Sequence, residues 1–165
     1  MTSSDYSIWF NEHHARYQME AGASPVGPRL DPTGPSGPVP WKLKWAVIFK
    51  DGYYAQVTET YTSTRREPSG ERLSFLYHYG KLPPNTDPNG FPLYKRSGAH
   101  TEIRVDLHPP LGPHLHYGDD DHITQARVSG FCITDCDIFR FMNAVNEHRL
   151  TARPFHEIFG FEVKP

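Results

Sequence analysis

Histidine is concentrated in one short stretch of this sequence. Five of its ten histidines lie between His100 and His122, together with Arg104 and Asp106. An imidazole can accept or donate a proton near neutral pH, and an arginine guanidinium can bind a phosphate through two parallel hydrogen bonds. Two imidazoles beside Arg104 would supply what RNA cleavage without a metal needs. These are a base for the 2′-hydroxyl, an acid for the leaving 5′-oxygen and a cation for the charged transition state.

The spacing within this stretch indicates which residues would lie on the same face of a sheet. Polar and apolar residues alternate in Arg104-Val-Asp106-Leu-His108, and two further imidazoles follow in Pro113-His114-Leu-His116. Alternate residues of a strand point to the same face, so each set should share one face of a sheet. Asp106 would orient an imidazole, as the third member of an acid–base relay does. The predicted catalytic residues are Arg104, Asp106, His108, His114 and His116.

This arrangement resembles the R-x-D … H … P-H-x-H core of the small TumE-like toxins of bacterial toxin–antitoxin pairs. The likeness runs from Tyr53 to His122 and includes the tyrosine-rich segment Phe75-Leu-Tyr77-His-Tyr79 ahead of the core. The insert at 80–98 and the acidic run at 119–121 depart from the family pattern. The resemblance implies a bacterial ribonuclease that acts on RNA without a cofactor and is neutralised by a cognate antitoxin.

A metal site is a second interpretation of the same stretch. His114, His116 and His122 would supply three nitrogen ligands for zinc or another divalent transition metal. Asp119 or Asp121 would add an oxygen ligand. Under this interpretation a chelator removes the metal and with it activity or stability, whereas a metal-free ribonuclease still works in chelator.

The third interpretation involves no catalysis. Histidines beside prolines line turns in many proteins, where their imidazoles bond to the backbone. Arg104 and Asp106 would then form a surface ion pair of little energetic weight. The chain would be a binding module such as an immunity protein, an antitoxin or an accessory subunit, and changing the histidines would affect packing alone.

The surrounding sequence predicts an antiparallel sheet that presents these residues. Trp41–Lys50 and Tyr53–Tyr61 flank Asp51-Gly52, a strong hairpin signal. Glu71–Tyr79 and His100–His108 alternate apolar and polar residues, as half-buried strands do. We therefore expect an α+β fold with a meander of about five strands.

A C-terminal helix should cover one face of this sheet. The apolar residues of Thr134–Arg149 recur at helical spacing, and Thr134 or Asp135 would cap its start. The side of the sheet that carries Ile103, Val105 and Leu107 should face this helix. A further strand is expected over Ile123–Ile133, and Phe155–Val163 is expected to be a final strand or a docking segment.

The chain divides into three parts by composition. The sequence of residues 1–21 predicts a short amphipathic helix, and that of residues 22–40, with six prolines, predicts an extended connector. Residues 41–165 fit a single α+β domain. The two cysteines, Cys132 and Cys136, are expected to be free thiols.

Charge and hydropathy limit the classes of partner. The formal net charge of −2 shows no basic excess, so RNA would have to be recognised locally rather than by a broad basic surface. The sequence has no signal-peptide pattern and no apolar run that could span a bilayer. We therefore expect a cytoplasmic protein that binds RNA or a protein partner and does not bind a membrane.

Overall fold

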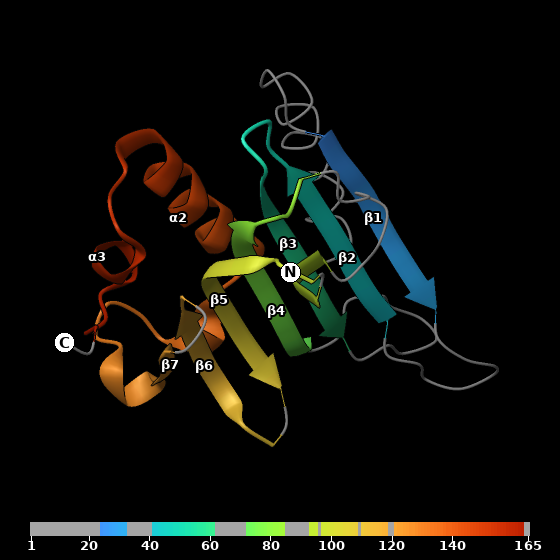
Figure 1. Ribbon diagram of the computed structural model, residues 1–165. Helices are drawn as coiled ribbons and strands as arrows, with labels where there is room; N and C mark the ends of the chain where they lie inside the picture. Colours follow the sequence, from blue (N-terminus) through green and yellow to red (C-terminus); the bar gives the residue numbers. More distant parts are fainter. Residues whose placement is uncertain are drawn as a thin grey trace.

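The computed structural model has an α+β fold with one antiparallel sheet and two helices near its C-terminus (Figure 1). It describes residues 24–32, 41–61, 72–84, 93–95, 97–108, 110–118 and 121–163, with the backbone alone for 24–32, 41, 94 and 121. The helix expected within residues 1–21 lies outside the described residues, as does the part of the connector beyond 24–32. No helix among the described residues is both long and apolar enough to cross a membrane.

The sheet is a meander of seven strands, in which each strand pairs antiparallel with the next in chain order. The strands are β1 (Ser24–Pro32), β2 (Trp41–Ile48), β3 (Tyr53–Tyr61), β4 (Arg72–Lys81), β5 (His100–His108), β6 (Gly112–Tyr117) and β7 (Asp121–Thr124). Strand β1 lies within the proline-rich connector and forms one edge of the sheet. Proline cannot donate a ladder hydrogen bond, so an edge is where a sheet tolerates it.

Two helices follow the sheet, α2 (Ile138–Thr151) and α3 (Phe155–Phe159). Helix α2 begins later than expected because Asp137, rather than Thr134 or Asp135, is its N-cap. The Asp137 side chain accepts a hydrogen bond of 2.8 Å from the Arg140 backbone N–H. Of the two expectations for Phe155–Val163, the docking segment is the one found, because α3 buries Phe155 and Phe159 in the main core. The expected strand is reduced to one bridge, between Phe161 and Val128.

The strand expected over Ile123–Ile133 ends at Thr124. Two short 3-10 turns take its place, η2 (Gln125–Arg127) and η3 (Ile133–Asp135). The Gln125 side chain explains the early end. Its amide nitrogen donates to the Phe131 carbonyl at 2.9 Å, and its amide oxygen accepts from the Ile133 N–H at 2.5 Å. These bonds satisfy backbone groups that a longer strand would have paired with a neighbour.

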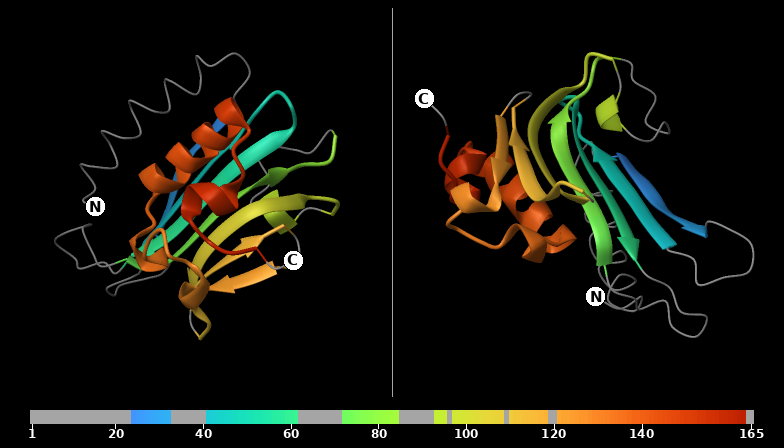
Figure 2. Two further views of the ribbon diagram at one scale, coloured as in Figure 1. Left: turned by 90° about the vertical axis from the view of Figure 1, so that its left-hand side faces the viewer. Right: turned by 90° about the horizontal axis from the view of Figure 1, so that it is seen from below.

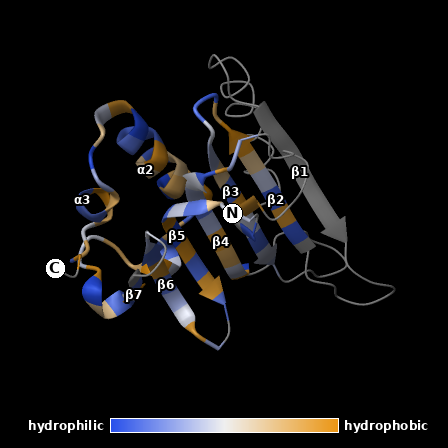
Figure 3. Cartoon of the chain, viewed as in Figure 1, coloured by the Kyte–Doolittle hydropathy of each residue, from blue (hydrophilic) through white to orange (hydrophobic). Residues whose placement is uncertain are grey.

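The main core lies between one face of the sheet and the two helices (Figure 2). Ile103 and Val105 are fully buried in it, as expected, together with Phe141 and Val145 of α2. Along the strands that Figure 3 colours, hydrophobic and hydrophilic residues alternate. Successive residues of a strand point to opposite faces, so one set lies toward the helices and the other on the opposite face of the sheet. Cys132 is exposed and Cys136 is buried, and both are free thiols.

The main core also encloses one carboxylate, that of Glu59 on β3. Its Oε2 accepts a hydrogen bond of 2.7 Å from Tyr61, and its Oε1 accepts one from Tyr77. Arg72 lies 3.4 Å from Oε1 and also donates to the Tyr77 hydroxyl and to the Thr134 carbonyl, each at 2.7 Å. Burial raises the pKa of the Glu59 carboxyl, while the two tyrosines and Arg72 act to lower it.

The opposite face of the sheet carries a second, smaller apolar cluster. Ala46 and Tyr54 pack there against Leu82 and against Leu93 of the 3-10 turn η1 (Leu93–Lys95). The Leu93 backbone N–H donates to the Gln56 side chain at 2.6 Å. This cluster lies over β2 and β3, whereas the predicted site residues lie on β5, β6 and β7.

Candidate functional site

A row of polar side chains crosses the sheet on the face opposite α2. The strand register pairs Gln56 with His78, His78 with Arg104, Arg104 with His116, and His116 with His122. Side chains that face each other across antiparallel strands lie on the same side of the sheet. The next row along pairs Asp106 with His114. We call the part of this face formed by Arg104, Asp106, His108, His114, His116 and His122 the histidine face.

Arg104 and Asp106 are at the centre of the histidine face. Arg104 Nε lies 2.7 Å from Asp106 Oδ2, and Arg104 Nη2 lies 2.6 Å from His116 Nε2. The Asp106 side chain is 1% exposed and that of Arg104 is 24% exposed. The pair is therefore not the surface ion pair of the non-catalytic interpretation. Its guanidinium is paired with a buried carboxylate, and the Arg104 side chain as a whole remains partly exposed.

His114 lies beneath the accessible part of the face, with a side chain that is 1% exposed. Its Nδ1 lies 2.9 Å from the Gly112 carbonyl oxygen, and its Nε2 lies 2.5 Å from Asp106 Oδ1. Burial lowers the pKa of His114, against the Gly112 carbonyl and the Asp106 carboxylate, which raise it. At this depth, His114 can position its neighbours but cannot contact a polymeric substrate directly.

His116 lies between Arg104 and His122 and is half-buried. The pKa of His116 is lowered to about 4, mainly by burial. The positive charge of Arg104 lowers it further. A guanidinium has no lone pair to accept a hydrogen bond, so Arg104 donates and His116 Nε2 accepts. His116 is thus a neutral imidazole at pH 7 with its basic nitrogen turned toward the guanidinium.

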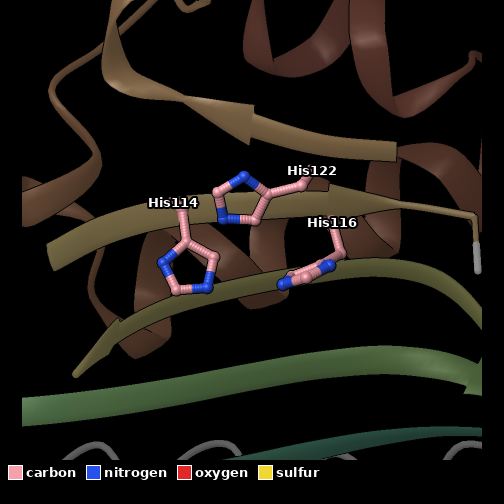
Figure 4. Close-up of side chains that lie close together, drawn as sticks. All are labelled: His114, His116 and His122. Atoms are coloured by element: carbon pink, nitrogen blue, oxygen red, sulfur yellow. The ribbon is translucent and has the colours of Figure 1, made fainter. Parts of the chain in front are cut away.

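His122 and His108 flank the buried centre. The ring of His122 is exposed and lies 5.1 Å from that of His116 and 4.6 Å from that of His114, centre to centre (Figure 4). His108 is 43% exposed, and its Nε2 lies 3.8 Å from Asp106 Oδ1. The face therefore combines a buried layer with accessible imidazoles on both sides.

The structure brings together all the residues predicted for catalysis and all the histidines predicted for metal binding. One potential ligand atom from each of His114, His116 and His122 lies within 4.8 Å of the others, and the same holds for Asp106, His108 and His114. Of the aspartates considered as oxygen ligands, Asp119 lies outside the described residues, and Asp121 is described only by its backbone.

His78 is a neighbour of the site that sequence analysis had not placed there. It is buried, its Nδ1 contacts the Tyr54 hydroxyl at 2.5 Å, and its Nε2 lies 3.0 Å from Thr101 Oγ1. The signal for it is present in the alternation of β4, where His78 falls on the side opposite Tyr77 and Tyr79. Identifying it requires the register that sets His78 beside Arg104.

Comparison of the chain with protein-family models, curated proteins and solved structures finds no match.

Proposed function

We propose that this chain cleaves RNA phosphodiester bonds by metal-independent acid–base chemistry on the histidine face. The observation that carries the proposal is the row Arg104, His116, His122. In this row a partly exposed arginine side chain contacts one imidazole through its guanidinium, and a second imidazole follows. A phosphate bound by Arg104 would lie next to both rings. The lowered pKa keeps His116 neutral at pH 7, the state in which a base can take a proton. It also makes the imidazole a weaker base, and part of this lowering comes from Arg104.

His116 would act as the general base and His122 as the general acid. When the Arg104 guanidinium turns from His116 to the phosphate, the lone pair of His116 Nε2 becomes available. This nitrogen then takes the proton of the 2′-hydroxyl, and the 2′-oxygen forms a bond to phosphorus. The bond from phosphorus to the 5′-oxygen breaks, and His122 gives its proton to that oxygen. Arg104 stabilises the charge that develops on the non-bridging oxygens. The products are a 2′,3′-cyclic phosphate and a free 5′-hydroxyl.

Asp106 and His114 would act as positioning residues. Asp106 holds Arg104 Nε at 2.7 Å and so fixes the direction of the guanidinium, while His114 packs beneath His116 and His122. His108 lies at the rim beside Asp106, where it would contact the substrate or the leaving strand. All five residues predicted for catalysis thus have a place in the proposed site, and His122 joins them.

The resemblance to TumE-like toxins extends this proposal to biology. The chain would be a cytoplasmic toxin of a bacterial toxin–antitoxin pair, and a cognate antitoxin would neutralise it by covering the histidine face. The formal net charge of −2 fits an enzyme that recognises a short accessible segment of RNA rather than a long duplex.

The first test is cleavage of single-stranded RNA by the purified chain in excess EDTA. We expect products that end in 2′,3′-cyclic phosphate, and we expect them equally from a His100→Ala variant. His100 is an exposed histidine at the start of the same strand as Arg104, so it controls for the loss of an imidazole outside the site. Absence of cleavage by the wild-type chain would contradict the proposal and favour the non-catalytic binding module.

A further inference from the structure

The two most buried side chains of the histidine face, Asp106 and His114, point their polar atoms at each other. His114 Nδ1 lies 2.9 Å from the Gly112 carbonyl, which can only accept a hydrogen bond. Nδ1 therefore carries the proton, and Nε2 is the nitrogen that offers a lone pair. This Nε2 lies 2.5 Å from Asp106 Oδ1, which also offers lone pairs.

The second oxygen of Asp106 is already engaged. Its Oδ2 pairs with Arg104 Nε at 2.7 Å, which leaves Oδ1 directed at His114. Among the described residues, three buried atoms here make no hydrogen bond of good geometry, and they are Asp106 Oδ1, His114 Nε2 and Arg104 Nε. For Arg104 Nε, the ion pair with Asp106 Oδ2 still balances the charge. Two facing acceptors in a buried site repel each other unless a cation lies between them.

A third potential ligand lies beside these two atoms. His108 Nε2 is 3.8 Å from Asp106 Oδ1, and one ligand atom from each of Asp106, His108 and His114 lies within 4.8 Å of the others. Ligand atoms at about 2.1 Å from a tetrahedral zinc ion lie about 3.4 Å from one another. The distances of 2.5 Å and 3.8 Å fall on either side of this value, and the ligand atoms of the two imidazoles lie within 4.8 Å of each other. Side-chain movements of up to about 1.5 Å would therefore bring the three atoms to this spacing.

The outer contacts of this set are those of a metal site. A histidine that binds a metal usually donates its other ring N–H to a carbonyl or a carboxylate, and a carboxylate ligand is itself hydrogen-bonded. His114 has the Gly112 carbonyl in that position, and Asp106 has Arg104. We infer that Asp106 Oδ1, His108 Nε2 and His114 Nε2 bind a divalent transition metal such as zinc, with the remaining coordination position open.

The three-histidine set is the weaker alternative. The single lone pair of a neutral His116 ring is at Nε2, which already accepts a hydrogen bond of 2.6 Å from Arg104. A metal bound by His116 would have to displace this contact and would lie next to a guanidinium without the intervening carboxylate. In the set of Asp106, His108 and His114, the Asp106 carboxylate would lie between the metal ion and the Arg104 guanidinium.

This inference stands apart from the proposed cleavage. Zinc at this set would withdraw His108 and His114 from acid–base chemistry and would leave Arg104, His116 and His122 accessible. Metal binding is measured without RNA, and cleavage is measured in EDTA, so either proposal can fail while the other holds.

The test is a calorimetric titration of the full-length, tag-free chain with Zn²⁺ after removal of metal by EDTA and dialysis. We expect one zinc per chain. Loss of an outer-shell partner typically weakens metal binding by about 10–100-fold, so loss of a ligand in His108→Ala should weaken it by at least about tenfold. His108 is 43% exposed, which makes a folding defect in this variant a minor concern. His122→Ala is the matched control and should bind zinc as the wild type does.

Two results would overturn the inference. The first is no zinc binding by the wild-type chain, which would mean that a proton rather than a metal separates Asp106 and His114. The second is an affinity that falls in His122→Ala but not in His108→Ala, which would assign the metal to the three-histidine set. Asp106→Asn provides a second test, because asparagine has the shape of aspartate without its charge. This variant should also bind zinc more weakly than the wild type.

Discussion

An Arg72→Met variant is expected to lose about 3–5 kcal/mol of its free energy of unfolding at neutral and alkaline pH, because it leaves the buried Glu59 carboxylate without its cation. Glu59 is fully buried, and Arg72 lies 3.4 Å from its Oε1 with a side chain that is 19% exposed. Methionine keeps an unbranched apolar side chain beside the Phe75 ring but loses the cation–π contact that the Arg72 guanidinium makes with it. The loss therefore reports mainly on the charge and its hydrogen bonds.

The pH dependence of this loss has a definite sign. Burial raises the pKa of Glu59 above its ordinary value of 4.5, so the folded state holds the proton more tightly than the unfolded state. Its contribution to stability is complete below pH 4.5 and declines as the pH rises through the folded pKa. Arg72 lowers that pKa, and its removal raises the folded pKa further. The deficit of the variant should therefore be small at acid pH and grow as the pH rises.

Urea denaturation at about pH 4 and about pH 8 measures this difference. Arg153→Met is the control, because Arg153 forms exposed ion pairs with Glu147 and Glu157 and should show no comparable change at either pH. The double variant Glu59→Gln, Arg72→Met should lose the pH dependence. A deficit of the same size at both pH values would mean that Glu59 keeps one protonation state in both folded proteins over this range, and it would contradict the expected pH dependence.

The alternation of β5 is the part of the fold that the sequence predicted best. A strand repeats every two residues, so the single pattern from His100 to His108 predicted both that Ile103 and Val105 would face the helix and that Arg104 and Asp106 would lie opposite. The number of strands was harder to predict from the sequence. Strand β1 lies in a proline-rich segment, and β7 is four residues long. Neither carries the extended alternation that makes a strand visible in a sequence.

The sequence did not show how deeply each histidine of the site would be buried. His114 and His116 are two residues apart on one strand and look equivalent in the sequence, yet His114 is buried and His116 is partly accessible. The difference depends on neighbours across the sheet, with Asp106 beside His114 and Arg104 beside His116. The same is true of His78, which is buried and pairs across the sheet with Arg104. Register, rather than residue type, assigns these histidines to different roles.

A His116→Ala variant is expected to cleave RNA about 10²–10⁴-fold more slowly than the wild type if His116 is the general base. The effect should appear in kcat, because the imidazole acts on the proton in the transition state and contributes little to the binding of RNA. The variant also frees Arg104 Nη2 from its 2.6 Å contact with His116. Arg104 remains paired with Asp106, so phosphate binding should persist.

The division of roles between His116 and His122 can be tested with a substrate that needs no acid. Uridine 3′-(p-nitrophenyl phosphate) has a leaving group that departs without a proton, so a general acid adds little to the rate of its cleavage. His122→Ala should then be slow on RNA but close to wild type on this ester, whereas His116→Ala should be slow on both. Each variant should bind the ester with nearly unchanged KM, and thermal melting would confirm that both remain folded.

Equal slowing of both variants on the ester would remove the assignment of His122 as the acid, and normal cleavage of RNA by His116→Ala would remove His116 as the base. The two substrates together thus separate a pair of catalytic imidazoles from a cluster of histidines that only stabilises the sheet.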